Sequence, residues 1–285
     1  MKILFLGGDK RQKQMIRDLY EKGHNINLLG FENLDTDNKL KKVTLNNLNI
    51  SKYDVIIFPV GGVNKNFMIK AYYHNNDIKI DPNILKDTKE DVLIFTGVKT
   101  PFLKTIEDIS KRNIIPLMNE KDVVIPNAIV TCEGIVKDLI DCSDVTIYGS
   151  NIMVIGYGNV GKRLVELLHN MGAKVKVAVK EKEDYFALSK LGIKSFYSKD
   201  IKHYLEHSNI IVNTAPSLVL SKDELKLVNK DTYLLDVASL PGGIDLDSAN
   251  ELGLKNKHLL GIPGYTAPIT AGRILSKKIN EYIGR

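Results

Sequence analysis

The sequence of 285 residues contains only two cysteines, Cys132 and Cys142, and neither has histidine partners at metal-ligand spacing. A disulfide framework and a metal site are therefore not expected, and a reducing compartment is the default. The longest apolar runs have the length of a strand, far short of the ~20 residues that a membrane helix needs. The apolar part of the N-terminus, residues 3–6, is too short for a secretory signal. We therefore expect a cytoplasmic protein without a membrane span.

A concentrated basic surface is also lacking, although the formal net charge is +6. The lysines are scattered along the chain and form neither a basic helix stripe nor a basic–aromatic array, so nucleic-acid binding is not expected. The positive charge would instead help to attract anionic cofactors and substrates. With 44% hydrophobic and 26% charged residues, the composition is that of a globular protein, and the length allows two domains.

The most informative stretch that is present is a glycine-rich fingerprint. An apolar, strand-like run at 151–155 leads into Gly156-x-Gly158-x-x-Gly161, and a helical pattern of apolar residues follows directly. This context predicts a dinucleotide-binding βαβ unit, with the second strand at 174–179. Gly156 would permit the tight turn, Gly158 the close approach of a pyrophosphate, and Gly161 the packing of helix on strand. The backbone at the helix start, including Asn159 and Val160, would bind the pyrophosphate.

The end of the second strand predicts the cofactor. NAD-binding proteins usually place an acid there, about 20 residues beyond the glycines, to bind the ribose 2′-hydroxyl. Here Val179 occupies that position, and Lys180 and Lys182 follow it. Two lysines suit a 2′-phosphate, which favours NADP. NAD stays the alternative, because an error in the register of the strand would restore Glu181 as an acidic ribose ligand.

Strand-like runs alternate with amphipathic helical patterns along the whole chain. This alternation predicts an α/β protein with two doubly wound parallel-sheet domains, of which the second is a Rossmann domain. We expect a flavodoxin-like, substrate-side domain over 1–126 and a Rossmann domain over 127–266. A linking helix would start at Pro126 and run to about 141. A C-terminal helix at 267–285 would return to the first domain, and the polar stretch 31–52 would be a surface excursion.

Ligands of open parallel sheets bind at the carboxyl ends of the strands. Several loops expected there are rich in glycine, proline and small hydroxyl residues, which lets a ligand approach the backbone. They would line a common cleft between the two sheets. In the Rossmann domain they add candidate cofactor contacts at Asn213, Thr214, Ala215, Pro216, Ala238 and Ser239.

These stretches together resemble the A subunit of bacterial dipicolinate synthase, and the resemblance covers nearly the whole chain. It rests on residues 7–12 (GGDKRQ), 126–134 (PNAIVTCEG), 156–161 (GYGNVG), 236–243 (DVASLPGG) and 263–273 (PGYTAPITAGR). The resemblance implies a dehydrogenase of the EC 1.3.1 type that acts in sporulation, in the cytoplasm of the mother cell. It would oxidise a dihydrodipicolinate, derived from the tetrahydrodipicolinate branch of lysine biosynthesis, to dipicolinate (pyridine-2,6-dicarboxylate). A nicotinamide cofactor would take the hydride, a flavoprotein-like B subunit would accompany the chain, and we expect a homo-oligomer.

This reaction needs a base that removes a proton next to the carbon that loses the hydride. Glu133 on the linking helix is the first candidate, with a solvated or dipole-stabilising glutamate as the competing interpretation. Asp236 is a weaker candidate, since an acid at a strand end often only caps a loop, and Ser239 could supply a hydroxyl. None of the six histidines lies in a motif loop, so no catalytic histidine is expected.

The two substrate carboxylates need cationic or hydroxyl partners. Lys10 and Arg11 are the main candidate cations, with Arg11 favoured for bidentate geometry. Arg273 is a weaker one, because an arginine on a helix is usually a surface residue. The candidate hydroxyl groups are those of Thr131, Thr266 and Thr270.

Two other functions compete with this one. A D-2-hydroxyacid dehydrogenase shares the layout, but it needs an imidazole near the C-terminal strand, and residues 262–265 contain no histidine. A non-catalytic subunit that binds NADP for regulation is the second alternative, and only an activity measurement separates it from an enzyme. S-adenosylhomocysteine hydrolase has a similar cofactor domain, but this chain is too short to carry its substrate half.

Overall fold

The structure is a computed structural model that describes residues 1–36 and 39–284. The chain divides into two compact units, which we call the first unit (residues 1–127 and 263–285) and the second unit (residues 128–262). Each unit is built on a six-stranded sheet in which all neighbouring strands run parallel. The predicted α/β class with two parallel sheets is therefore confirmed.

In the first unit the strand order is β3-β2-β1-β4-β7-β8. Without the short edge strand β3, this is the order of a flavodoxin-like sheet. β3 lies inside the polar stretch 31–52, and only Val43 of its three residues is buried, so its sequence carries no strand signal. A small antiparallel hairpin, β5 Met68–Ile69 with β6 Ile78–Lys79, was also not predicted. The strands of the sheet are β1 Lys2–Leu6, β2 Asn25–Leu29, β3 Lys41–Val43, β4 Val55–Ile57, β7 Leu93–Thr96 and β8 Ile114–Pro116.

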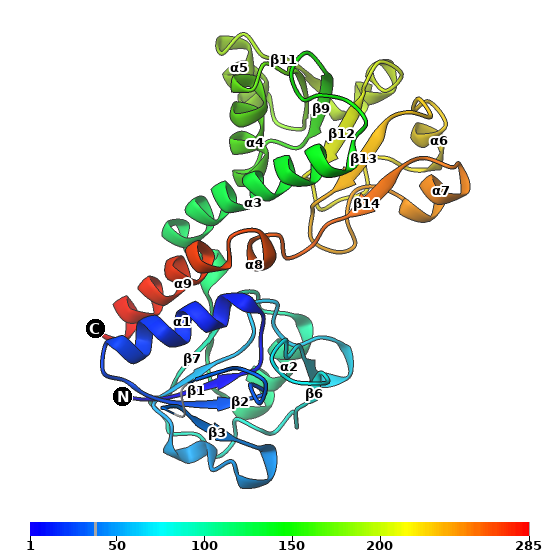
Figure 1. Cartoon of the computed structure of the whole chain (residues 1–285). Helices are drawn as coiled ribbons and strands as arrows, with labels where there is room; N and C mark the ends of the chain where they lie inside the picture. Colours follow the sequence, from blue (N-terminus) through cyan, green and yellow to red (C-terminus); the bar gives the residue numbers. More distant parts are fainter. Residues whose placement is uncertain (37–38, 285) are drawn as a thin grey trace. The chain divides into compact units, whose positions relative to one another are not determined.

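Helices cover both faces of this sheet. On one face α1 (Lys10–Glu21) and α9 (Pro268–Ile283) lie side by side and share an apolar core with the strands (Figure 1). On the other face α2 (Pro101–Ser110) packs with the loops between β3 and β7. A glycine permits the close approach of α1 and α9, because a Cβ on Gly272 would lie 2.6 Å from the carbonyl oxygen of Arg11. The C-terminal helix α9 therefore belongs to the same unit as β1 and α1.

Helix α3 runs over Lys121–Cys142 and contains Pro126 in its interior. The predicted start at Pro126 is therefore wrong by five residues. Tertiary contacts within the first unit hold the earlier turn: Val123 is fully buried, and Asp122 accepts a hydrogen bond from Lys278 of α9 at 2.9 Å. Proline lacks an N–H and usually marks the first turn. Here packing of the preceding residues outweighs that preference.

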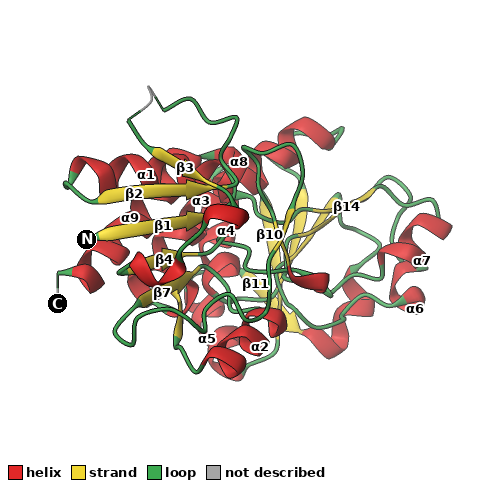
Figure 2. Cartoon of the chain, turned by 90° about the horizontal axis from the view of Figure 1, so that it is seen from below, coloured by secondary structure: helices red, strands yellow, loops and turns green. Residues whose placement is uncertain are grey.

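In the second unit the strand order is β11-β10-β9-β12-β13-β14, which is the Rossmann order. One face is covered by α3, α4 (Asn159–Asn170) and α5 (Lys182–Lys190), and the other by the 3-10 helix η5 (Ser198–Tyr204), α6 (Lys222–Leu225) and α7 (Leu246–Glu251). Figure 2 distinguishes these helices from the strands by colour. The strands are β9 Asn151–Ile155, β10 Lys174–Val179, β11 Lys194–Tyr197, β12 Ile210–Asn213, β13 Tyr233–Asp236 and β14 Asn256–His258.

A short helix, α8 (Pro263–Thr266), precedes α9 in the first unit. Among the described residues, no helix is long and apolar enough to cross a membrane.

Candidate functional site

The glycine fingerprint forms the turn between β9 and α4. Gly156 has φ of +92°, and a Cβ there would lie 2.7 Å from Thr214 Oγ1. A Cβ on Gly161 would lie 2.3 Å from the carbonyl oxygen of Gly156, so helix and strand need a glycine to approach this closely. In contrast, a Cβ on Gly158 would meet nothing within 4 Å. The space in front of Gly158 is therefore open to a ligand.

Gly158 is the N-cap of α4 and offers the helix no side-chain hydrogen bond. The first N–H groups of a helix have no partner inside the helix, and they point towards the positive end of its dipole. With no side chain in front of them, they can donate to the phosphate oxygens of a ligand. The turn thus has the chemistry of a pyrophosphate site.

A cavity of about 610 Å³ lies beside this turn, and we call it the nucleotide cavity. Its walls come from the carboxyl ends of β9, β10, β11 and β12, where ligands of such sheets bind. Its charged groups are Lys162, Lys180, Lys199 and Asp184, so positive charge predominates. Lys162 lies 3.6 Å from Asp184. The full lining is Gly156, Tyr157, Gly158, Lys162, Ala178, Lys180, Asp184, Ser198, Lys199, Ala215, Ser217, Leu218 and Val219.

The residues that follow β10 and β11 line one end of the nucleotide cavity. Lys180, Ser198 and Lys199 line both the nucleotide cavity and a smaller adjoining cavity of about 300 Å³. The ammonium of Lys182, which the sequence also suggests, lies 5.6 Å from the centroid of the Phe186 ring. Neither Lys182 nor Glu181 is among the described residues that line either cavity.

Lys199 and Ser198 were missed in the sequence. They follow β11 immediately, and the rule that ligands bind at the carboxyl ends of parallel strands would have found them. Lys199 therefore supplies a second cation beside Lys180, a role for which the sequence analysis had proposed Lys182.

A buried carboxylate organises the loops that follow β12 and β13. Asp236 is fully buried, and its two oxygens accept hydrogen bonds from the backbone N–H groups of Ala238 (3.0 Å), Gly243 (2.7 Å) and Ile244 (3.0 Å). The side-chain amide of Asn213 donates a fourth, at 2.8 Å. Each oxygen therefore already has two donors. This geometry favours a structural role for Asp236 over proton transfer.

The same network holds the neighbouring candidates in place. The Asn213 amide also donates to the carbonyl oxygen of Ala215 (2.9 Å), and Thr214 Oγ1 donates to that of Ile155 (2.9 Å). His258 Nε2 lies 2.8 Å from the carbonyl oxygen of Ala238 and donates to it. His258 thus has a bracing role that the sequence did not suggest. Pro216 and Ser239 are exposed.

Ser239 stands at the exposed part of this braced loop. Its hydroxyl makes no hydrogen bond with another described residue, while the backbone on either side is fixed through Asp236. A free hydroxyl on a rigid loop is suited to contact a ligand.

Helix α3 carries the predicted base. Glu133 is exposed, whereas Thr131, with 9% exposure, and Cys132 are buried in the second unit. The Cys132 thiol donates to the carbonyl oxygen of Val160 at 3.5 Å, at the start of α4. Burial raises the pKa of this thiol to about 12, so it stays protonated and unreactive. Of these side chains, Glu133 is the one that solvent and ligands can reach.

The loop after β1 forms a compact structure in the first unit. Asp9 is the N-cap of α1 and accepts the backbone N–H of Arg11. The guanidinium of Arg11 binds the same carboxylate through Nε (3.0 Å) and Nη2 (2.5 Å), with its side chain only 6% exposed. Arg11 is therefore already paired and buried. Lys10 is less buried, and its ammonium lies 5.2 Å from the centroid of the exposed Tyr72 ring.

Residues of α8 and α9 complete the candidates of the first unit. Gly264 lies against the Asp9–Arg11 pair, because a Cβ there would be 3.0 Å from Asp9 Oδ2. Thr266 is half-buried and Thr270 is exposed.

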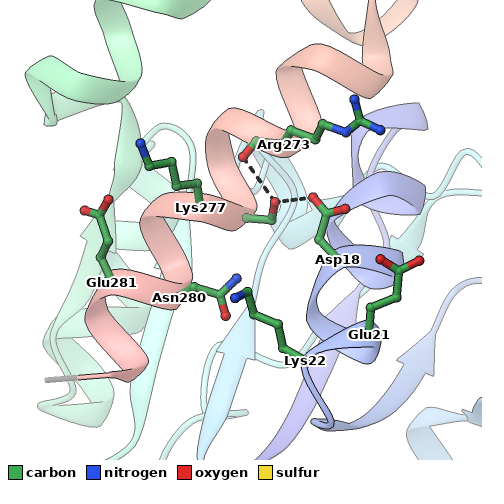
Figure 3. A pocket seen from close by; sticks show the side chains of 8 residues that line it. Asp18, Glu21, Lys22, Arg273, Lys277, Asn280 and Glu281 are labelled. Carbon is green, nitrogen blue, oxygen red and sulfur yellow. Dashed lines mark hydrogen bonds between the residues drawn. The ribbon is translucent and has the colours of Figure 1, made fainter.

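Arg273 lines a groove between α1 and α9 (Figure 3). The other charged groups of that groove include Asp18, Glu21 and Glu281 as well as Lys22 and Lys277. Charges of both signs are therefore balanced there, which does not suit a dianionic substrate. Among the described residues, no group of His, Cys, Asp and Glu is arranged to hold a metal ion.

Two protein-family models match the chain. The model of the N-terminal domain of the dipicolinate synthase A subunit matches residues 2–118, and the NAD-binding domain of S-adenosyl-L-homocysteine hydrolase matches residues 127–261. The dipicolinate synthase A subunit of Bacillus subtilis (strain 168) is 31% identical over 284 residues, which is 99% of this chain and 96% of that protein. The chain belongs to the family of dipicolinate synthase A subunits.

Solved structures agree with this assignment. The crystal structure of the dipicolinate synthase A subunit from Bacillus halodurans has a TM-score of 0.94 at 30% identity, and the match covers 100% of this chain and 98% of that one. The corresponding protein from Bacillus subtilis has a TM-score of 0.89 at 31% identity, covering 100% and 96%. The resemblance inferred from the sequence motifs is confirmed, and the second unit is a dehydrogenase-like domain of the type that binds a nicotinamide dinucleotide.

Proposed function

We propose that this chain is the dehydrogenase subunit of a dipicolinate synthase, which oxidises dihydrodipicolinate to dipicolinate with NADP as cofactor. The observation that supports it most is the cation-rich nucleotide cavity, in a chain that matches a dipicolinate synthase A subunit along 99% of its length. The dihydro substrate would derive from the tetrahydrodipicolinate branch of lysine biosynthesis. The reaction would serve sporulation, in the mother-cell cytoplasm.

The residues of the nucleotide cavity fit such a cofactor. The open backbone at Gly158 and the uncapped start of α4 would bind the pyrophosphate, with Asn159, Val160 and Gly161 at the first turn. Lys180 and Lys199, together with Ser198, would bind a 2′-phosphate. A bound nicotinamide ring supplies the acceptor for the hydride.

The chain's own residues would handle the proton and the substrate. When dihydrodipicolinate becomes aromatic, one ring carbon loses a hydride and a neighbouring one loses a proton. Glu133, exposed on α3, is the carboxylate that we propose as proton acceptor. Ser239 would donate a hydrogen bond from its braced loop, and Asp236 would keep that loop in place.

Several polar groups would orient the two carboxylates. In the first unit these are Lys10, Thr266 and Thr270, which are exposed or half-buried. The guanidinium of Arg11 is already paired with Asp9 and could bind a substrate carboxylate only while it shares that pairing. We therefore propose that Arg11 mainly positions the loop around Lys10. Thr131 is largely buried and would support the helix turn that carries Glu133.

The relatives are named as A subunits, which leads us to propose a second, different subunit as partner. We propose a flavoprotein-like B subunit and a homo-oligomeric state for this chain.

Product formation tests the proposal. The purified chain, with and without the B subunit, is supplied with NADP+ and the condensation product that precedes dihydrodipicolinate, and dipicolinate is identified by its mass and retention. We expect dipicolinate together with an equal amount of NADPH. Glu133→Gln should reduce kcat by about 100-fold or more, as the loss of a general base does. Asp141→Asn removes an exposed carboxylate from the same helix and should not.

The alternatives predict other results. Cofactor binding without dipicolinate under all conditions would indicate a non-catalytic, regulatory role. A Glu133→Gln variant with full activity would remove Glu133 from the mechanism and leave the dehydrogenase activity itself in place.

A further inference from the structure

The second unit has another cavity, of about 470 Å³, at the amino ends of its strands. Asn151, Lys174 and Lys194 line it, and each is the first residue of its strand, β9, β10 or β11. The nucleotide cavity lies at the carboxyl ends of the same strands. The two cavities therefore lie at opposite edges of one sheet, and we call the second the basal cavity.

Three lysines of the basal cavity lie on one face of the sheet. Side chains in a strand alternate between faces, so Lys174 and Lys176 share a face with Ala178, and Lys194 shares one with Phe196. Ala178 and Phe196 pack in the core with η5, so the three lysines lie on the face of the sheet that η5 covers. Lys176 and Lys194 are direct partners in the parallel register of β10 and β11. Covered strands of a parallel sheet normally carry apolar residues, and like charges opposite each other are unfavourable.

Tyr204 of η5 contacts two of these ammonium groups. Lys176 Nζ donates to the carbonyl oxygen of Tyr204 at 2.7 Å, and Lys194 Nζ lies 5.2 Å from the centroid of its ring. The ring in turn stacks on Phe196, with 3.9 Å between centroids. Burial, and then repulsion from Lys194, lower the pKa of Lys176. The fold thus tolerates a local concentration of positive charge.

Three histidines line the same cavity as the lysines. His169, from the end of α4, and His203 and His207, from η5 and the turn after it, also line the basal cavity. None of the described residues that line the basal cavity carries a carboxylate. None of these three lysines and three histidines forms an ion pair with another residue in the described ranges 1–36 and 39–284. Elsewhere in the second unit, lysines such as Lys162, Lys222 and Lys257 are paired with carboxylates.

We infer that the basal cavity is a binding site for a diphosphate-type oxyanion, either free or as part of a nucleotide. Several ammonium and imidazole donors converge on one small space, which matches the dense negative charge of linked phosphates. A dicarboxylate such as the proposed substrate carries two separated single charges and matches it less well. Bound anion would also relieve the repulsion between Lys176 and Lys194. The site is separate from the nucleotide cavity and does not depend on the proposed reaction.

The six histidines of the chain provide a site-resolved test with the full-length protein. The imidazole NMR signals are assigned by single His→Gln variants, and sodium pyrophosphate is titrated at constant ionic strength and pH. His169, His203 and His207 line the basal cavity, whereas His24, His74 and His258 do not. We expect the first three signals to shift together with one dissociation constant of about 1 mM or below, a range that several charge-assisted contacts can supply. The other three should hardly move.

A charge-matched pair of variants makes the test specific. The double variant Lys176→Met/Lys194→Met should weaken pyrophosphate binding by about 10-fold or more, through the loss of two charge-assisted contacts. Lys137→Met/Lys190→Met removes the same charge from exposed positions of α3 and α5 outside the cavity and should leave the affinity within about 2-fold. Because the first substitution removes like charges that repel each other, it should fold.

The outcomes separate the sources of the anion and decide the inference. If ADP shifts the three cavity signals with a lower dissociation constant than pyrophosphate does, the ligand is a nucleotide. If the dissociation constant of ADP is equal or higher, the ligand is free diphosphate. The inference is wrong if the three signals do not move up to about 10 mM, a concentration at which even weak ion pairing is seen. It is equally wrong if all six move alike, or if both double variants bind as the wild type does.

Discussion

The choice between NADP and NAD can be tested at two lysines with a third as control. Lys180 and Lys199 line the cavity at the ends of β10 and β11, whereas Lys182 lies against Phe186. Changing each lysine to methionine removes the charge but keeps most of the apolar stem. We expect Lys180→Met and Lys199→Met to weaken NADP+ binding and to leave NAD+ binding unchanged. Lys182→Met should change neither.

The magnitude follows from the exposure of these side chains. Both lysines are exposed, so each contact with a 2′-phosphate is worth about 0.5–1 kcal/mol, less than the 1.5–3 kcal/mol of a buried charge-assisted bond. Each single variant should therefore weaken NADP+ about 2- to 5-fold. The double variant should lose about 1–2 kcal/mol, which corresponds to roughly 5- to 30-fold. The wild type should prefer NADP+ over NAD+ by a similar factor.

Calorimetric titration of the wild type and these variants with both cofactors, at low and at moderate salt, measures these differences. The preference for NADP+ should shrink as salt increases, because exposed ion pairs are screened. Tighter binding of NAD+ by the wild type would refute the reasoning. So would a Lys182→Met variant that loses as much NADP+ affinity as Lys180→Met.

Three further predictions concern stability, each measured by urea unfolding. Arg11→Ala should lower the free energy of unfolding by about 2–4 kcal/mol, because it leaves Asp9 without its buried partner. Arg17→Ala on the same helix breaks an exposed pair with Glu21 and should lower it far less. Asp236→Ala should cost about 3–5 kcal/mol, since four donors lose their acceptor, and the exposed Asp247→Ala less than about 1 kcal/mol. Burial alone would raise the pKa of Glu107, but the N–H of Ile114 and the ammonium groups of Lys104 and Lys99 lower it to about 2. Its contribution is therefore present above pH 4.5 and is lost as the pH falls towards 2, so the wild type should lose more stability over that interval than Glu107→Gln. Equal losses in any of these pairs would contradict the stated cause.

The fold class could be predicted because its signals are local. Apolar strands alternate with amphipathic helices, and the glycines at 156, 158 and 161 occur directly between a strand and a helix. The structure adds a steric reason for Gly156 and for Gly161, whereas the space in front of Gly158 is open. β3 had no such signal, because a three-residue edge strand with one buried side chain resembles a polar loop.

Features that depend on tertiary contacts could not be predicted. Pro126 suggested a helix start, but packing of Val123 and the pairing of Asp122 with Lys278 extend α3 upstream. The sequence suggested that Arg11 is a cation available to a ligand, but Asp9, two positions before it, forms an ion pair with its guanidinium. The basal cavity combines residues from α4, β10, β11 and η5, and each looked like a scattered surface lysine or histidine in the sequence.

The loop that begins at Asp236 shows how a buried group can serve a site without taking part in the chemistry. A carboxylate in the interior is costly unless its oxygens are satisfied, and here three backbone N–H groups and one amide satisfy them. The same bonds fix the backbone before and after Ser239, and His258 fixes the carbonyl of Ala238. The backbone at Ser239 is therefore held in place by the fully buried Asp236, while the Ser239 hydroxyl itself stays exposed. Substitution of Asp236 should consequently disturb the site through the position of Ser239, and the proton acceptor has to be sought among the accessible carboxylates, of which Glu133 is our candidate.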